Sequence, residues 1–183
     1  MSIDLYKPFT NPITKETFRC LSFTPDAYTM EWIVQPEGYV PFEHIHLNQD
    51  EIFHLQAGEI RIVIDGKEHI AEANRTITVP KGARHIAYNN KPETLTCIVE
   101  YRPGLDHYQL FQCFAGLTPD REMDAKGGVN IPKMMYFVKK MNTRAVACPT
   151  RVPKPLLGLL LNMFYLIGTL AGWKKQFRQY TGE

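Results

Sequence analysis

The chain has 183 residues, of which 44% are hydrophobic and 22% charged, a composition typical of a globular protein and not of a disordered one. This length suits one domain, or one domain with a substantial appendage. Cysteines are far apart and form no CxxC pair, which argues against a zinc ribbon, a thioredoxin-type site and a disulfide framework. The first residues contain no apolar signal region, so we expect a cytoplasmic protein.

The net charge of +2 is unevenly distributed along the chain. Residues 1–120 contain ten Lys or Arg against sixteen Asp or Glu, whereas residues 121–183 contain eleven against three. Such a basic C-terminal third can meet an acidic surface. The two parts can also neutralise each other within a monomer or dimer, and the sequence leaves both explanations open.

Short β-rich runs separated by turn signals follow an irregular lead-in of about a dozen residues. The predicted strands are Phe18–Thr24, Thr29–Gln35, Glu51–Gln56, Ile60–Ile64, His69–Ala73, Thr76–Val79, Arg84–Tyr88 and Leu95–Tyr101. Asp65-Gly66 predicts a tight hairpin, because Asp and Gly tolerate the positive φ that type I′ turns need. Regular short strands without intervening helices are typical of a β-sandwich or a barrel.

Beyond Arg102 the pattern changes to helical spacing. A first helix is predicted from Leu105 to Ala115, with Gly116 just after its end. Asn130 would cap a second helix whose apolar face is rich in methionine. Such a face can bind a partner, but it more often packs in a core.

The third C-terminal segment, Leu156–Trp173, contains eighteen residues without a charge. As one helix it would be about 27 Å long, just short of the apolar thickness of a bilayer. Small or weakly polar residues would form one stripe along it: Gly158, Asn162, Tyr165, Thr169 and Gly172. We expect this helix to pack on the protein itself or across a homodimer. Contact of residues 156–178 with a membrane interface is the alternative, ahead of a spanning helix.

Residues 38–58 contain the clearest chemical signal. His44 and His46 are two residues apart, so both side chains point to one side of a strand. Glu51 begins the next apolar run, and His85 lies in a second polar stretch. Three imidazoles and a carboxylate suit a divalent transition metal such as Fe, Mn, Ni or Zn. On a six-coordinate ion they would keep two positions open, whereas a structural zinc site is closed and usually contains cysteine.

These two stretches resemble the two sequence motifs of the cupins. The first motif matches throughout as Gly38-x5-His44-x-His46-x4-Glu51-x6-Gly58. The second matches as Pro80-x-Gly82-x2-His85-x3-Asn89. Only its leading glycine differs; Asn74 stands there, and Asn is the residue other than glycine that best tolerates left-handed backbone.

The resemblance covers about residues 30–103 and is to the small single-domain cupins. It implies a mainly β fold, a double-stranded β-helix or jelly-roll barrel, with a metal near its centre. The family's metal ligands correspond to His44, His46, Glu51 and His85. Residues 1–104 would then form the cupin domain. Residues 105–183 would form a helical extension that packs on the barrel or on a partner.

Strand parity predicts a chiefly apolar pocket around the metal, suited to a small, partly apolar ligand. The side chains that share the inward faces are Trp32, Phe42, Phe53, Leu55, Ala87 and Asn89. By the same parity His54 and Tyr88 face away from the ligands. His69 and His107 have no partners in the sequence, and we expect both to be structural.

Three functions are compatible with these residues. The first, which we expect, is a metal-dependent oxidoreductase of the dioxygenase type, with Glu51 as a ligand or as a catalytic base. The second is a small-molecule-binding or sensor protein without turnover, and the third is a metal-dependent isomerase or lyase. Cupins include all three, so the fold does not choose among them. No motif indicates nucleic-acid binding or a further cofactor.

Overall fold

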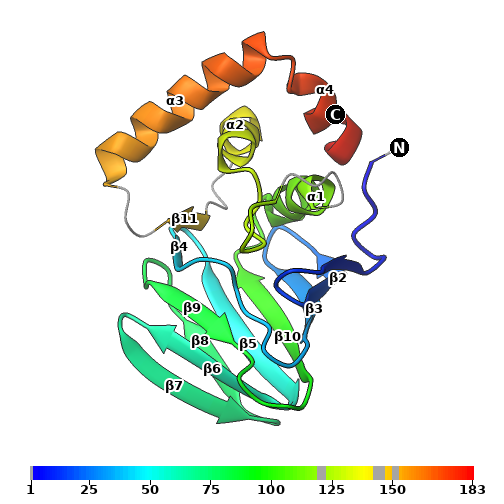
Figure 1. The fold of residues 1–183 in the computed structure, drawn as a ribbon, viewed down its shortest axis with the longest axis vertical. Helices are drawn as coiled ribbons and strands as arrows, with labels where there is room; N and C mark the ends of the chain where they lie inside the picture. Colours follow the sequence, from blue (N-terminus) through cyan, green and yellow to red (C-terminus); the bar gives the residue numbers. More distant parts are fainter. Residues whose placement is uncertain (1, 119–122, 142–146, 150–152) are drawn as a thin grey trace.

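Two antiparallel sheets pack face to face to form a jelly-roll barrel, and helices cover one end of it (Figure 1). The computed structural model describes residues 2–118, 123–141, 147–149 and 153–183. The larger sheet has the order β1-β2-β3-β10-β5-β8, formed by Phe9–Asn11 (β1), Glu16–Phe23 (β2), Tyr28–Val34 (β3), Leu95–Arg102 (β10), Asp50–Ala57 (β5) and Thr76–Val79 (β8). The other sheet has the order β11-β4-β9-β6-β7, formed by Ala147–Pro149 (β11), His44–His46 (β4), His85–Tyr88 (β9), Glu59–Ile64 (β6) and Lys67–Glu72 (β7). The predicted fold class is confirmed.

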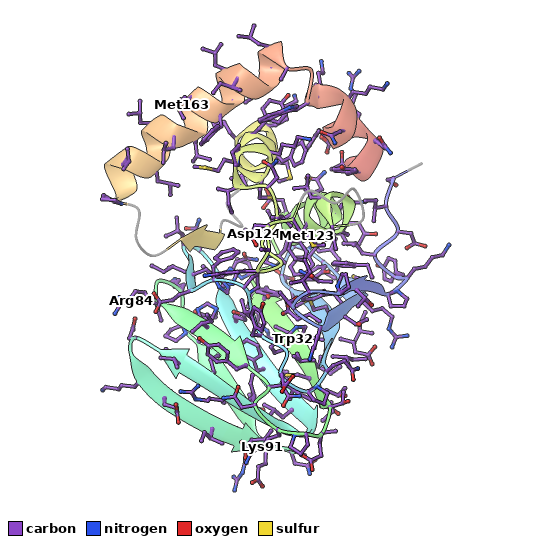
Figure 2. All side chains as sticks on the ribbon, viewed as in Figure 1. Trp32, Arg84, Lys91, Met123, Asp124 and Met163 are labelled. Atoms are coloured by element: carbon purple, nitrogen blue, oxygen red, sulfur yellow. The ribbon has the colours of Figure 1, made fainter. Side chains whose placement is uncertain are left out.

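Alternating burial explains the central place of β3 and β10 in the larger sheet. The buried residues of β3 are Tyr28, Met30, Trp32 and Val34. Every second residue of β10 is buried as well, and the register pairs Trp32 with Cys97. Since alternate side chains of a strand point to opposite faces, the apolar half of each strand lies inside the barrel, as Trp32 does (Figure 2).

The strands predicted between Phe18 and Tyr101 are all present. The hairpin between β6 and β7 turns at Asp65 and Gly66, whose φ angles of 48° and 79° are those of a type I′ turn. Asn74 has a φ of 67°, so it adopts the left-handed backbone that its place in the second motif predicts. Local turn chemistry therefore fixes the conformation of these two turns.

β1 was not expected, and the prediction of an irregular lead-in is wrong for these residues. β1 pairs with β2, and Phe9 stacks on Phe18 with ring centroids 5.1 Å apart. Phe111 and Phe114, from the first helix, lie edge-on against Phe18, each at 5.7 Å. Phe9 of β1 also lies edge-on against the same two rings, at 6.5 and 5.9 Å, so part of its aromatic packing comes from a helix a hundred residues away in the chain.

The first helix, α1 (His107–Leu117), lies between the barrel and the other helices (Figure 1). It begins two residues later than predicted, because Leu105 has a φ of 50° and precedes the helix. Gly116 lies inside α1 and does not end it. A side chain at Gly116 would overlap the ring of Tyr180, so glycine there lets a later helix approach α1 closely.

The second helix, α2 (Ile131–Met141), begins where the sequence predicts. The side-chain oxygen of Asn130 accepts a hydrogen bond from the backbone N–H of Lys133 at 3.1 Å, which is the geometry of an N-cap. Tyr136 and Phe137 are buried against the C-terminal residues Phe177 and Tyr180. This helix therefore belongs to a second hydrophobic core, outside the barrel.

The uncharged segment does not form one helix as predicted. α3 (Lys154–Leu170) ends before Gly172, whose φ is 75°, and the chain then bends by 95° into α4 (Lys174–Thr181). No single helix in the described part of the chain has both the length and the apolar character needed to cross a membrane. Taken together, the bent pair α3 and α4 meets those two criteria.

α3 lies across the far side of α2 from the barrel (Figure 1). Tyr165 stacks on Tyr136 with ring centroids 5.5 Å apart, and Gly168 is buried against Tyr136 and Trp173. The division of the chain at residues 104 and 105 into a domain and an extension stays a prediction.

Candidate metal centre

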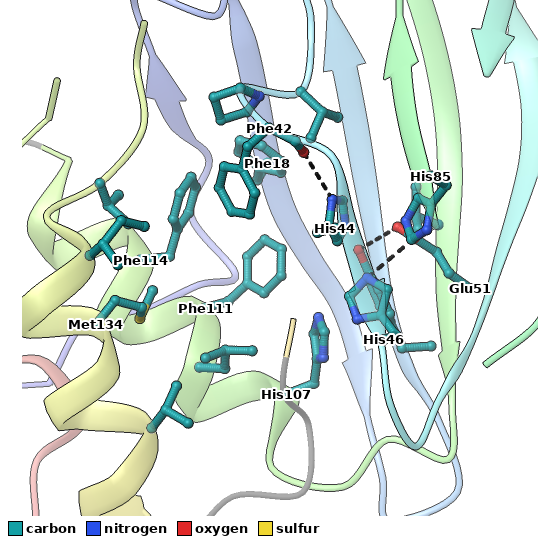
Figure 3. A pocket seen from close by; sticks show the side chains of 18 of the residues that line it. Phe18, Phe42, His44, His46, Glu51, His85, His107, Phe111, Phe114 and Met134 are labelled. Atoms are coloured by element: carbon teal, nitrogen blue, oxygen red, sulfur yellow. Dashed lines mark hydrogen bonds and ion pairs between the residues drawn. The ribbon is translucent and has the colours of Figure 1, made fainter. Parts of the chain in front are cut away.

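The four residues of the two motifs come together inside the barrel (Figure 3). His44 and His46 lie on β4, Glu51 on β5 and His85 on β9, so both sheets contribute. The register pairs His44 directly with His85. One ligand atom from each of the four lies within 4.8 Å of the others, a spacing that could hold a metal ion.

The atoms in this cluster fit a divalent cation. Glu51 Oε2 lies 2.7 Å from His85 Nε2 and 3.3 Å from His46 Nε2, but neither contact has the angles of a hydrogen bond. Ligand atoms at 2.0–2.2 Å from an ion and at right angles to each other lie about 3 Å apart. Buried polar atoms without a partner are costly. The spacing and the unpaired atoms are therefore both accounted for by an ion among these side chains.

Hydrogen bonds orient three of the four residues. His44 Nδ1 lies 3.2 Å from the carbonyl oxygen of Phe42, and His85 Nδ1 lies 3.2 Å from that of Ala83. Since a carbonyl only accepts, each Nδ1 carries the proton and each Nε2 is left to bind an ion. The hydroxyl of Tyr101 donates to Glu51 Oε1 at 2.7 Å. Such outer contacts fix the direction of metal ligands and raise metal affinity.

The electrostatics of the cluster favour ligand forms of these side chains. Burial, with the neighbouring imidazoles, lowers the pKa of His44 to about 3, so this ring is neutral at pH 7. Burial alone would raise the pKa of Glu51, but His46 and His85 outweigh it and hold this pKa well below its usual range. Burial would lower the pKa of His85, and the Glu51 carboxylate outweighs burial and raises it. A divalent cation would replace that proton.

Residues 30–101, which include all four residues of the cluster, match the family model described as the cupin domain. This part of the chain is a cupin domain. The match covers β3 to β10 and ends before α1, so the helices lie outside it.

Solved structures with this fold share little sequence with the chain. They include the cupin domain of Schizosaccharomyces pombe Cnp3, with 12% identity over 53% of this chain and 68% of that chain and a TM-score of 0.48. KdgF from Halomonas sp. has 17% identity over 51% of this chain and 85% of that chain, with a TM-score of 0.47. An uncharacterised double-stranded β-helix protein from Klebsiella pneumoniae has 21% identity over 57% of this chain and 84% of that chain, with a TM-score of 0.48. No curated protein matches the sequence.

The cupin cluster opens into a cavity of about 430 Å³. Of the six residues predicted for the pocket, four line this cavity: Trp32, Phe42, Phe53 and Ala87. Leu55 and Asn89 are not among the lining residues. Leu55 is buried in the barrel core, and the Asn89 side-chain amide donates to the carbonyl oxygens of Val34 and Glu93 at 2.9 and 2.8 Å. Asn89 therefore closes a turn.

The other wall of the cavity is helical, and the sequence did not predict it. Phe111 and Phe114 of α1 and Met134 of α2 face the cluster across the cavity (Figure 3). Leu161 and Phe164 of α3 also line it. Since these residues come from three helices beyond the cupin motifs, strand parity could not identify them. The helices complete a site that the barrel leaves open.

His107, the first residue of α1, lies beside the cluster. Its ring stacks on Tyr101 at 3.8 Å and lies 6.0 Å from the ring of His46. Its Nδ1 is 3.1 Å from Gln49 Oε1, while Gln49 Nε2 donates to two carbonyl oxygens. Burial lowers the pKa of His107 well below its usual range, so the ring is neutral. Its Nε2 has no hydrogen-bond partner in the described structure. No motif spacing could have singled it out.

Glu16 is the one carboxyl group besides Glu51 among the described residues that line the cavity. It is buried on β2, and the indole N–H of Trp32 donates to its Oε1 at 3.0 Å. Burial raises the pKa of Glu16 to about 8, although Thr14 and Trp32 offset part of this rise. This group is therefore a protonated acid at pH 7, which suits the apolar wall around it.

Proposed function

We propose that the protein is a metal-dependent oxidoreductase of the dioxygenase type that acts on a small, largely apolar molecule. The observation that carries this proposal is the apolar cavity of about 430 Å³ that opens onto a buried cluster able to hold a metal ion. Among the described residues no lysine or arginine lines this cavity. A phosphorylated or strongly anionic substrate would therefore lack a counter-charge, whereas an apolar one would be desolvated favourably.

Each residue of the site has a defined role in this proposal. His44, His46, Glu51 and His85 would hold the ion, which, if redox-active, supplies electron transfer with dioxygen. The hydrogen bond from Tyr101 keeps Glu51 directed at the ion, so Glu51 serves as a ligand. The aromatic wall from α1 orients the substrate and excludes water.

A metal-dependent isomerase or lyase is the second candidate, and His107 favours it. Its neutral ring has an Nε2 without a partner in the described structure, at the wall of the cavity. That nitrogen could accept a proton from a bound substrate, the step that an isomerase or lyase needs. The predicted homodimer and the predicted cytoplasmic location stay predictions.

Dioxygen uptake tests the proposal. The protein would be loaded anaerobically with Fe(II) or Mn(II) and offered a panel of apolar phenols, ketones and carboxylic acids. We expect uptake that depends on one class of compound, is lost in His46→Ala and is retained in the control His69→Ala, since His69 is exposed on β7. Conversion without dioxygen would favour the isomerase or lyase. Tight binding without any product would identify a binding protein.

A further inference from the structure

One face of α3 exposes a continuous row of large apolar side chains. Its residues are Leu156, Leu159, Met163, Leu166, Ile167 and Leu170. The three most exposed are Leu170 at 81%, Leu159 at 64% and Leu166 at 62%. Side chains project from the side of α3 that faces away from α2 (Figure 2). A single exposed leucine is ordinary, but a contiguous apolar surface of this kind marks a docking site.

Packing of α3 within the chain uses the opposite side of the helix and does not cover the exposed row. The opposite side of α3 already has its partners, because Tyr165 stacks on Tyr136 and Gly168 is buried against Tyr136 and Trp173. Leu161 and Phe164 face the cavity. The outer row therefore needs a partner outside the part of the chain that the structure describes.

Positive charge lies next to this row. Lys174 and Lys175 at the start of α4 and Arg178 in its last turn are exposed, and no acidic residue occurs between residues 154 and 182. Trp173 lies in the chain between Leu170, the last residue of the row, and these cations. An apolar face that adjoins lysine and arginine is complementary to a bilayer with anionic headgroups.

A second copy of α3 fits this face less well. Leu156, Leu159, Met163, Leu166 and Leu170 follow the alternating spacing of three and four that a paired helix uses. Paired helices in water usually have charged residues beside such a seam, where they select the partner and the orientation. Here the flanking positions are Leu160, Asn162, Ile167 and Thr169, none of them charged. A lipid surface requires no such pairing.

We propose that the outer face of α3 docks on the surface of an anionic lipid bilayer. The helix lies in the interface, and the basic start of α4 contacts the headgroups. Docking does not depend on the proposed enzymatic function. Because the inner face of α3 lines the cavity, docking also places one wall of the cavity beside the bilayer.

Vesicle sedimentation of the full chain tests this proposal. With vesicles of phosphatidylcholine and phosphatidylserine we expect binding that weakens as salt is raised and is much weaker on phosphatidylcholine alone. L159E/L166E should lower the affinity by about tenfold or more, since two charges would enter the interface. K174E/K175E changes exposed residues of α4 and should also weaken binding. The control Ile70→Glu changes an exposed apolar residue on β7 and should leave binding unchanged.

Three outcomes would overturn the proposal. The first is no sedimentation of the wild-type protein with anionic vesicles. The second is equal binding by wild type and L159E/L166E. The third is a wild-type dimer that L159E/L166E makes monomeric while vesicles have no effect, which would identify the face as a contact between two copies. Metal-free protein should bind vesicles as the loaded protein does, so failure of the proposed enzyme would not affect this result.

Discussion

The barrel and its helical cover, formed by helices α1 to α4 (Figure 1), differ in where they place polar and apolar side chains. Inside the barrel, within an otherwise apolar core, lies one cluster of ionisable groups, of which His46 is 5% exposed and Glu51 4%. In the cover the apolar groups also lie outside, where Leu170 is 81% exposed. Buried ionisable groups and an exposed apolar row are both costly unless a partner satisfies them. The two proposed partners, a cation inside the barrel and a lipid surface outside the helices, would satisfy these two costs, with the cavity between them.

The largest effect is expected on the free energy of unfolding, from the carboxyl group of Glu16, which lies in the apolar wall of the cavity inside the barrel. Its pKa is raised from 4.5 to about 8 in the folded protein. Below about pH 4.5 Glu16 is protonated both in the folded protein and in the unfolded chain. Between there and about pH 8 the unfolded chain releases its proton while the folded protein keeps it. The free energy of unfolding should therefore fall, relative to Glu16→Gln, by on the order of 4 kcal/mol across this interval.

Urea unfolding of both proteins at pH 5 and pH 8 measures this difference. Glutamine retains an acceptor for the Trp32 indole, so the comparison isolates the proton. An equal gap between wild type and variant at the two pH values would show that Glu16 is ionised in the folded protein. The wall of the cavity would then be more polar than its composition indicates.

A somewhat smaller effect is expected from Tyr101→Phe, which removes the hydrogen bond to Glu51 and leaves the four ligands in place. Loss of such an orienting contact should weaken metal affinity about 10- to 100-fold. Tyr88→Phe is the matched control, since the Tyr88 ring lies under the guanidinium of Arg61, away from the cluster. Competition with a chelator measures both. Unchanged affinity in Tyr101→Phe would show that Glu51 does not need this donor.

Substitutions at two glycines of α3 test whether α3 packs on α2. A side chain at Gly168 would overlap the rings of Tyr136 and Trp173, whereas one at Gly158 would meet nothing within 4 Å. Gly168→Ala should lower the free energy of unfolding by about 1–3 kcal/mol. Gly158→Ala should raise it by up to about 1 kcal/mol, because alanine favours the helix. Thermal unfolding compares the pair, and identical shifts would contradict the packing of α3 on α2.

The smallest effect is expected from Asn74→Gly, which restores the glycine of the second cupin motif. Asn74 has a φ of 67°, a backbone that asparagine tolerates with little strain. We expect the free energy of unfolding to rise by less than about 1 kcal/mol. A larger gain in a denaturant titration would mean that the turn is strained in the natural sequence.

The same contrast explains what the sequence predicts well. His44, His46 and Glu51 follow from spacing on strands, because the alternation of side chains fixes their direction within a few residues. The hairpin at Asp65-Gly66 follows from local turn chemistry. Both features depend on short stretches of chain, so both could be predicted.

The features that could not be predicted depend on contacts between distant parts of the chain. Phe9 of β1 packs against aromatic residues of α1, and His107 reaches the cluster only because α1 packs on the barrel. Leu55 has the parity of Glu51, but it lies four residues further along β5, opposite Cys97, and packs in the core beyond the cavity. The left-handed backbone of Gly172 follows the end of α3. The uncharged run from Leu156 to Trp173 predicted one longer helix, because a glycine within such a run does not by itself show where the helix ends.

The measurement that tests the central claim most directly is the metal content of the protein, purified without chelator and without nickel resin. Elemental analysis should find close to one equivalent of a divalent transition metal per chain in wild type and in the control His69→Ala. It should find almost none in His44→Ala, which should remain folded by circular dichroism. Folded wild-type protein without metal that binds none on reconstitution, or equal content in wild type and His44→Ala, would contradict the metal centre.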